Sequence, residues 1–548
     1  MIIDSAELTD AVASDLSVCI IGSGAAGITL ACELDGAPFK VLQLEAGGDA
    51  PAPQTQDYYN GEATNPHPPS HEYRRVAFGG TTSVWGGRCV PFDPIDFEQR
   101  DYVANSGWPI SYQTVAEHYP RALEYCDAGA FDFTASGSIE RVRDTISGFN
   151  GSGVAEVDLI ERYSLPTDFG KRYRERMRRS TNVTSVLKAR CVGLVKDPLD
   201  ERLSAVEIVL PSGARRRITA KIFVLALGGI ETTRLLLASN PEGISFGNRY
   251  DRLGRFYGCH LESTCGKLVP HGAEVAFDFE RTHDDVYCRR KFAFSAAAQR
   301  EHRLLNTAFR LHFPEYSDAG HGSAAMSMIY LAKSFLLTEY RKILQHDAEF
   351  AVISPNGAHI RNVVTGVPQL LKFSYDWIFR RHLAERKLPY TLVANADGSY
   401  PLEFNCEQTP IESSRITLSN EADAHGIKRV RVDWRRSDED IAAILRAFQL
   451  LRTTFERSGL CRLEFDDQKL VQRVSRSAPV GGHHIGTTRM ASNERAGVVD
   501  ENCALFDLSN VFVASSAVFP TGGHANPTLT IVAMAVRLAG HLKTHPAL

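Results

Sequence analysis

Two adjacent histidines, His483 and His484, stand in the segment GGHHIGTTRM, residues 481–490. Such a pair can belong to a metal site, to a buried polar cluster, or to an active site in which one ring is a base. The metal interpretation is disfavoured because no nearby acid or cysteine at ligand spacing completes a site. Imidazole is the side chain best suited to accept a proton near neutral pH. If the segment is extended, successive side chains point to opposite faces, so we expect only one ring to act.

A second candidate for chemistry is Asn526 in HANPTLT, residues 524–530. Its carboxamide can donate to a substrate oxygen and orient it but cannot take the proton, so it would complement a single base. Pro527 suits the first turn of a helix, and Asn526 is therefore also expected to cap that helix. His524 is expected to be a packed or solvent-facing residue rather than a second base.

A nucleotide-binding unit is indicated near the N-terminus. The segment SVCIIGSGAAGITLACEL, residues 17–34, joins a β-branched run to a helical pattern through Gly22, Gly24 and Gly27. The next apolar run ends at Glu45. In such a βαβ unit the glycines let the backbone approach a pyrophosphate at the helix N-terminus, and the acid binds ribose hydroxyls. A plain glycine-rich turn is the alternative, and the unit by itself does not distinguish NAD from FAD.

Two further glycine-rich segments extend this unit. FGGTTSVWGGR, residues 78–88, packs four glycines around threonine, serine and tryptophan, which leaves backbone donors free to approach a flat ligand. AKIFVLALGGIETTRLLLASN, residues 220–240, repeats the order strand, Gly-Gly, helix and is predicted to join the same sheet. The sequence therefore predicts an α/β chain whose nucleotide domain is discontinuous.

Composition and charge exclude several classes of protein. The chain has 548 residues, 43% hydrophobic and 23% charged, as in ordinary soluble globular proteins. Its net charge of -4 gives no electrostatic footprint for a nucleic-acid partner. The 11 cysteines are scattered without CxxC or zinc spacing, which favours a reducing compartment. The N-terminus lacks signal-peptide order and no long uncharged apolar run is present, so we expect a cytoplasmic protein without a transmembrane segment.

In order and spacing, these motifs resemble the glucose-methanol-choline (GMC) oxidoreductases. The likeness runs from about residue 15 to the end, with few motifs in the middle third. The style of GGTTSVWGG and GGHANPT is closest to the sugar-oxidising branch that includes pyranose oxidases. The motifs that carry the resemblance are GSGAAG with Glu45, GGTTSVWGG, LALGGIETTRLLL, SSRITLSNEAD at 413–423, HHIGTTRM, and ASSAVFPTGGHANPTLTIVAMA at 514–535.

The resemblance implies bound FAD and an alcohol that is oxidised to a carbonyl. The family pattern H-x-x-G-T falls on residues 483–487, which puts the base on His483, with Asn526 as its partner and His484 as the bystander. Pyranose oxidases with covalent flavin attach it through a histidine in the loop that matches GGTTSVWGG. Val84 stands at that place here, so FAD is expected to be non-covalent. The residues expected to hold FAD are Gly22, Gly24, Gly27, Glu45, Gly79, Gly80, Thr81, Thr82, Val84, Trp85, Gly86, Val192, Ser516, Pro527 and Thr528.

We expect a Rossmann-like FAD-binding domain over residues 12–255 and 475–548, and a mixed α+β substrate domain over residues 256–474. The predicted function is FAD-dependent oxidation of a CH–OH group, with a sugar or glycoside as substrate and with oxygen or another electron acceptor. The alternatives are a lyase that cleaves a cyanohydrin-like alcohol without net redox, and an oxidoreductase of sterols or aliphatic alcohols. The stretch 370–387 has apolar residues at helical spacing and a basic far side. We interpret it as a helix of the second domain rather than as a membrane or partner surface.

Overall fold

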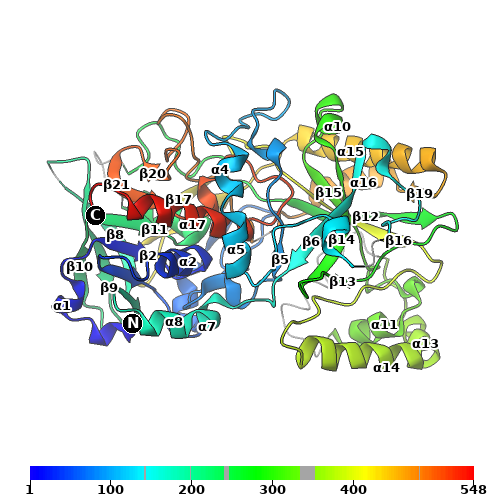
Figure 1. The fold of residues 1–548 in the computed structure, drawn as a ribbon, viewed down its shortest axis with the longest axis horizontal. Coiled ribbons are helices and arrows are strands. Elements are labelled where there is room, and N and C mark those ends of the chain that lie inside the picture. The colour runs from blue at the N-terminus through cyan, green and yellow to red at the C-terminus, as the bar shows by residue number, and fades with distance from the viewer. Residues whose placement is uncertain (141–142, 198, 240–245, 334–351, 481) are drawn as a thin grey trace.

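A seven-stranded sheet organises the half of the molecule that carries the glycine motifs (Figure 1). The computed structural model describes residues 1–140, 143–197, 199–239, 246–333, 352–480 and 482–548. All neighbouring strands in this sheet are parallel except the last pair. Its central strands are buried along their whole length, as in parallel sheets that are covered on both faces. In spatial order the strands are β1 (Ile2–Asp4), β7 (Val183–Leu187), β3 (Val41–Leu44), β2 (Val18–Ile21), β11 (Ile222–Leu225), β21 (Leu508–Val513) and β20 (Ala504–Leu505).

The glycine turn after β2 leads directly into α2 (Ala25–Glu33). Gly22 adopts a φ of +110°, and a Cβ there would lie 2.4 Å from the carbonyl oxygen of Ala226, so that only glycine fits. α2 packs against α17 (Thr528–Lys543), although the two helices lie near opposite ends of the chain (Figure 1). The predicted second unit is present as β11 followed by α9 (Gly228–Ala238). The α/β class predicted from the sequence is confirmed.

A second, antiparallel sheet forms the other half of the molecule. One face of this sheet is apolar and packs on α15 (Asp438–Ser458), where the ring of Phe404 lies 5.4 Å from that of Phe448. Side chains alternate along a strand, so Glu403 and Asn405 beside Phe404 point to the opposite face. In spatial order the strands are β19 (Cys461–Glu464), β12 (Leu261–Pro270), β16 (Tyr400–Cys406), β15 (Thr307–Leu311), β14 (Tyr287–Phe294), β6 (Ala155–Tyr163) and β5 (Arg88–Cys89), and β13 (Glu280–Arg281) pairs with β14.

The segments that form each of the two sheets do not follow the predicted domain boundaries. β5 and β6 belong to the second sheet although they precede residue 255, and β1 belongs to the first sheet although it precedes residue 12. The amino group of Met1 donates to the carbonyl oxygen of Val183 in β7 at 2.5 Å, which ties Met1 to the first sheet. We keep the division into a nucleotide domain and a substrate domain as a proposal, with β5 and β6 assigned to the substrate side.

Smaller elements complete the two halves. One three-stranded sheet contains β10 (Arg215–Thr219), β9 (Leu203–Val209) and β8 (Arg190–Lys196), and another contains β17 (Arg415–Ala422), β18 (Lys428–Asp433) and β4 (Gly61–Ala63). The remaining short helices are α1 (Asp10–Ala13), α3 (Pro53–Gln56), α4 (Tyr112–Ala116), α5 (Tyr119–Tyr125), α6 (Ala135–Ser138), α7 (Phe169–Arg172), α8 (Arg174–Arg179), α10 (Ala296–Glu301) and α16 (Asp467–Arg476). Among the described residues, no helix is both long and apolar enough to cross a bilayer.

Three helices project from the second half, at the lower right of Figure 1. They are α11 (Ala324–Leu331), α13 (Asn356–Thr365) and α14 (Val367–Tyr375), and a π-helical segment, Asp376–His382, continues α14. The stretch 370–387 is helical as far as His382, but its apolar side is not packed into the domain as predicted. Leu371 is 70% exposed and Tyr375 is 58% exposed.

Candidate active site

His483 is held between two polar side chains from distant parts of the chain. Its Nε2 lies 3.0 Å from Nδ2 of Asn526, which comes just before α17. Its Nδ1 lies 2.9 Å from Nδ1 of His260, which comes just before β12. The structure therefore brings the two predicted catalytic residues together and adds a third residue that the sequence did not indicate.

The hydrogen-bond partners assign a tautomer to each ring. A carbonyl oxygen only accepts, so His260 must donate from Nε2 to the oxygen of Gly522, which lies 3.3 Å away. Nδ1 of a neutral His260 is then an acceptor, and His483 must donate to it from Nδ1. This leaves a lone pair on Nε2 of His483, which faces the amide nitrogen of Asn526.

The surroundings keep both rings neutral. Burial, and then the neighbouring His260 and Arg88, hold the pKa of His483 well below the ordinary value for histidine. Burial lowers the pKa of His260 to about 3. Because a base must be unprotonated to accept a proton, His483 is ready to act at neutral and mildly acidic pH.

His484 points to a different environment from His483. Its ring stacks on that of Tyr257, with 6.1 Å between the centroids, and it lines the large cavity of the nucleotide half. Its carbonyl oxygen accepts a hydrogen bond from Oγ of Ser516 at 2.6 Å. The residues on either side of His483 line the cavity, as do Pro527 and Thr528 after Asn526, so the pair of His483 and Asn526 lies beside this cavity.

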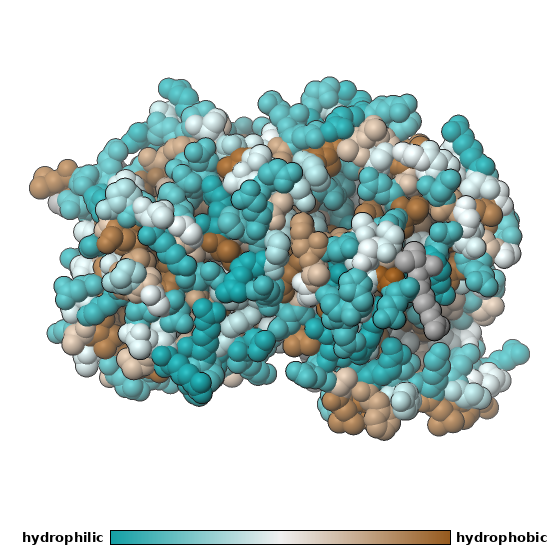
Figure 2. Space-filling model, viewed as in Figure 1, coloured by the Kyte–Doolittle hydropathy of each residue, from teal (hydrophilic) through white to brown (hydrophobic). Residues whose placement is uncertain are grey.

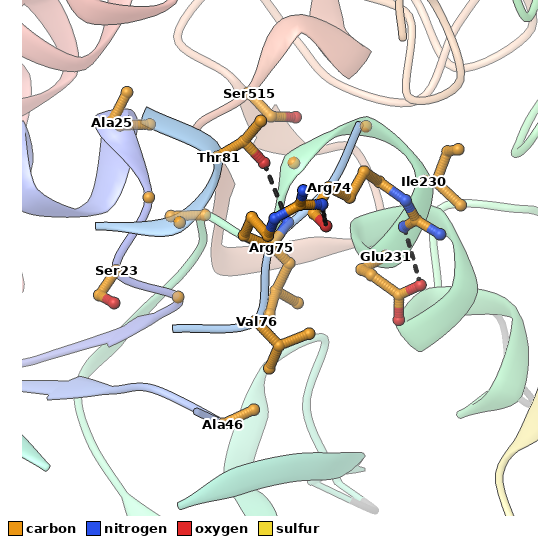
Figure 3. A pocket seen from close by; sticks show the side chains of 18 of the residues that line it. Ser23, Ala25, Ala46, Arg74, Arg75, Val76, Thr81, Ile230, Glu231 and Ser515 are labelled. Carbon is orange, nitrogen blue, oxygen red and sulfur yellow. Dashed lines mark hydrogen bonds and ion pairs between the residues drawn. The ribbon is translucent and has the colours of Figure 1, made fainter. Parts of the chain in front are cut away.

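The large cavity collects most of the residues that were predicted to bind the cofactor. Gly24 faces open space, since a Cβ there would meet no atom within 4 Å, and this leaves the N-terminus of α2 accessible to a phosphate. Figure 3 shows Ser23, Ala25 and Thr81 around the same space. The predicted residues that line the cavity are Gly22, Gly24, Glu45, Gly80, Thr81, Thr82, Trp85, Ser516, Pro527 and Thr528.

Five other predicted cofactor residues do not line the cavity. A Cβ on Gly27 would lie 2.1 Å from the carbonyl oxygen of Gly22, and a Cβ on Gly79 would lie 2.5 Å from the nitrogen of Gly170. These glycines are therefore required for close packing of the chain. Val84 is 52% exposed, and the side chain of Val192 is buried beside Cys191, which lines the cavity in its place. A Cβ on Gly86 would meet no atom within 4 Å, so Gly86 is not required for close packing.

Glu45 is positioned in the cavity wall by the chain around it. Its carboxylate accepts from Oγ of Ser23 at 2.6 Å and from the backbone nitrogen of Gly47 at 2.7 Å. Burial raises its pKa, and these hydrogen bonds oppose that rise. The backbone nitrogen of Ser23 also donates to this carboxylate at 3.2 Å, and because a carboxylate has about four lone-pair sites, one remains for a ribose hydroxyl.

Charged residues that were not predicted to bind the cofactor also line the cavity. Arg74 and Glu231 form an ion pair at 3.1 Å (Figure 3). Arg190 pairs with Asp423 through Nη2, but its Nη1 is buried and has no hydrogen-bond partner among the described residues. An unpaired guanidinium nitrogen, an open helix N-terminus and a buried acid fit the phosphates and ribose of FAD. Arg190, the N-terminus of α2 and Glu45 would therefore hold the FAD.

The second sheet carries a polar face near His483, whose pKa is lowered in part by Arg88 of β5. Ion pairs link its strands: Arg310 to Glu161 at 2.6 Å, Arg289 to Glu403 at 3.3 Å, and Arg88 to Glu262 at 3.1 Å. We call this set, with Lys291 and Asn405, the polar sheet face. Both side-chain polar atoms of Asn405 are buried without a hydrogen-bond partner among the described residues.

His524 is a packed residue, which is one of the two environments predicted for it. It is buried between Lys291, whose Nζ lies 3.1 Å from Nε2 of His524, and Asp93 at 3.3 Å. Asn526, in contrast, does not cap a helix. α17 begins at Thr528 with Pro527 in the cap position, and the Asn526 side chain is directed to His483 instead.

Comparison with known proteins agrees with this architecture. Residues 410–535 match the family model described as GMC oxidoreductase. A 2-methyl-1,2-propanediol dehydrogenase from Mycolicibacterium austroafricanum is 24% identical over 97% of this chain and 95% of its own length. A C-glycoside 3-oxidase from Microbacterium trichothecenolyticum is 29% identical, over 33% of this chain and 34% of its own. The crystal structure of pyridoxine 4-oxidase from Mesorbium loti superposes with a TM-score of 0.53 at 16% identity, covering 97% of this chain and 99% of that one.

The fold, the nucleotide cavity and these matches define the class of the protein. The chain is an FAD-dependent oxidoreductase that acts on the CH–OH group of an alcohol, and its residues 410–535 match the GMC oxidoreductase model. The predicted class of enzyme is confirmed at this level.

Proposed function

We propose that this enzyme oxidises a ring hydroxyl of a sugar or glycoside to a carbonyl, with His483 as the base. The observation that carries the proposal is the lone pair on Nε2 of His483. It is fixed by two hydrogen bonds, from His260 to the carbonyl oxygen of Gly522 and from His483 to His260. Nε2 of His483 lies 3.0 Å from Nδ2 of Asn526. A lone pair and an N–H donor side by side are what a substrate hydroxyl needs as it loses its proton.

The residues of this chain have distinct roles in the proposed reaction. FAD, when bound, supplies the acceptor for the hydride of the carbinol carbon. Nε2 of His483 takes the hydroxyl proton, and the amide nitrogen of Asn526 donates to the substrate oxygen and stabilises the negative charge that develops there. Nδ1 of His260 accepts from Nδ1 of His483 and fixes the tautomer that leaves the lone pair on Nε2.

The polar sheet face supports a substrate rich in hydroxyl groups. Asn405 stands opposite Glu262 in the strand register, and Leu261, next to His260, pairs with Cys406. Asn405 is therefore opposite the residue two positions after His260, which contacts the proposed base, and its amide has one donor group and one acceptor still to be satisfied. Nη2 of Arg310 is also buried without a hydrogen-bond partner among the described residues. Ring hydroxyls both donate and accept, and the similar C-glycoside 3-oxidase acts on a glycoside by its name.

An aliphatic alcohol is the second candidate substrate. The similarity to 2-methyl-1,2-propanediol dehydrogenase covers nearly the whole of both chains, which favours a small diol. The test is anaerobic mixing of the purified holoenzyme with sugars, glycosides, sterols and aliphatic alcohols while flavin absorbance is followed. Bleaching by a sugar or glycoside supports the proposal, and bleaching by small diols alone overturns the choice of substrate. Conversion of a cyanohydrin with an unchanged spectrum would indicate the lyase.

We propose that FAD is held without a covalent bond and that oxygen or another acceptor reoxidises it. Val84 carries no nucleophilic atom. Burial raises the pKa of the Cys191 thiol to about 12, which disfavours its reactive thiolate. Acid precipitation should leave the yellow colour in the supernatant. A yellow pellet that turns colourless in His484→Ala or His71→Ala would instead identify a covalent attachment. Reoxidation by air, compared with that by a quinone dye, distinguishes the acceptors.

A further inference from the structure

The projecting helices expose an unusually apolar surface. Most of the large hydrophobic side chains that are exposed among the described residues lie between positions 352 and 383. Leu371, Tyr375, Phe379 and Leu383 recur at four-residue spacing, so they share one side of α14 and its π-helical continuation. Figure 2 shows the resulting brown surface over α13 and α14. We call it the apolar patch. Exposed apolar patches of this kind mark sites of protein or membrane interaction.

The apolar patch is embedded in positive charge. Residues 352–387 contain six Lys or Arg and two Asp or Glu, whereas the whole protein has a net charge of -4. One of the two acids, Asp376, is buried and paired with Arg380 at 3.1 Å. Arg361, Lys372 and Lys387 are exposed. The local charge is therefore opposite in sign to that of the protein as a whole.

The combination of exposed apolar side chains and positive charge favours one kind of binding partner for the apolar patch. Two copies that met through the apolar patch by a two-fold axis would bring the same positive charges together, which disfavours a symmetric dimer. Amphipathic helices with basic residues and exposed Trp, Tyr and Phe lie at the interface of anionic bilayers, where apolar side chains enter the headgroup boundary. Trp377 is 51% exposed beside Tyr375 and Phe379 and supplies this aromatic character.

We propose that the apolar patch docks the enzyme on an anionic lipid bilayer. The segment that follows the patch is tied to the substrate half: the backbone nitrogen of Lys387 donates to the carbonyl oxygen of Leu165 at 3.0 Å, and Arg386 donates to the carbonyl oxygen of Tyr163 at 3.2 Å in β6. Docking through the patch therefore holds the substrate half of the molecule against the membrane. The proposal is independent of the identity of the substrate.

The test is flotation of the full-length holoenzyme with lipid vesicles. The protein should float with vesicles of phosphatidylcholine and phosphatidylglycerol, and should be released from them by high salt because the attraction is partly electrostatic. Vesicles of phosphatidylcholine alone should bind it weakly. The double variant Leu371→Ser, Phe379→Ser should lower the affinity for anionic vesicles about tenfold or more, because two apolar anchors are lost. Arg361→Glu combined with Lys372→Glu should lower it as well.

A matched control separates docking from loss of folding. Leu199 is 95% exposed on the other half of the molecule, and Leu199→Ser should float as the wild type does. Flavin absorbance and far-UV circular dichroism confirm that each variant is folded. Absence of binding by the wild type to anionic vesicles, or equal binding by the double variant, would overturn the proposal. A wild-type dimer that the double variant converts to a monomer, without vesicle binding, would assign the patch to a second copy.

Discussion

Nδ1 of His260 lies 2.9 Å from Nδ1 of His483, and this contact determines which nitrogen of His483 is free to accept a proton. Two unprotonated nitrogens would repel each other at this distance, so one ring must donate. The carbonyl of Gly522 requires the donor of His260 on the other nitrogen, and His483 is therefore the ring that donates. The result is a base with its lone pair directed to Asn526.

Replacement of each adjacent histidine distinguishes the two rings. His483→Ala should reduce the rate of flavin reduction by substrate by about a hundred- to ten-thousand-fold, because the base is lost, while FAD stays bound. His484→Ala should retain a substantial part of the rate, since its ring stacks on Tyr257 along the cavity wall. Stopped-flow reduction under anaerobic conditions measures both. Equal losses, or a larger loss in His484→Ala, would move the base to His484.

His260 is proposed to act as a positioning residue, and its replacement tests the tautomer assignment. His260→Leu removes the acceptor for Nδ1 of His483 and should lower kcat on the order of tenfold to a hundredfold with little change in KM. It also removes one of the groups that lower the pKa of His483, so the acid limb of the kcat/KM profile should move to higher pH. His260→Asn places a side-chain oxygen near the former Nδ1 and should recover part of the rate. An unmoved acid limb in His260→Leu would show that the contact is only structural.

The fold was more predictable from the sequence than the site. The turn around Gly22 and Gly24 could be predicted because its signal is local in sequence. The positive φ of Gly22 and its close approach to Ala226 both require a glycine. His260 gave no local signal, because its importance arises from a contact with a residue 223 positions away. The apolar side of α14 was predicted to be packed because helical spacing of Leu371 and Tyr375 does not reveal whether a neighbour covers them.

The buried histidines should make stability dependent on pH. The pKa of His260 is about 3 in the folded protein, against about 6.5 for an unperturbed histidine, so the unfolded state binds more protons between these values. Stability is therefore complete above about pH 6.5 and falls as the pH is lowered toward 3. Urea denaturation across this range measures the slope. In His260→Asn the slope should be shallower than in the wild type, and an unchanged slope would contradict the assigned pKa.

Asn405 should show a conflict between stability and function. Its carboxamide is buried without hydrogen-bond partners among the described residues, a state that costs about 1–3 kcal/mol per group. Asn405→Leu should therefore stabilise the fold by about 1 kcal/mol and raise the KM for a sugar substrate about tenfold, because the substrate loses its partner. Phe404→Leu, on the apolar face of the same strand, is the control and should lower stability without this change in KM. A destabilised Asn405→Leu with normal KM would place Asn405 away from the substrate.

Asn526→Asp tests the electrostatic role of the partner that faces the base. The amide lies 3.0 Å from Nε2 of His483, so a carboxylate there would favour the protonated imidazole and raise the low pKa of His483. It would also oppose the negative charge that develops on the substrate oxygen, and the rate of flavin reduction should fall roughly a hundredfold or more. Because the raised pKa leaves less of His483 as free base in acid, the loss should be greatest at low pH and smaller at high pH. Anaerobic reduction rates across pH measure this, with Asn526→Ala as the uncharged control, for which the acid limb should not rise. A wild-type rate and pH profile in Asn526→Asp would place this side chain outside the reacting site.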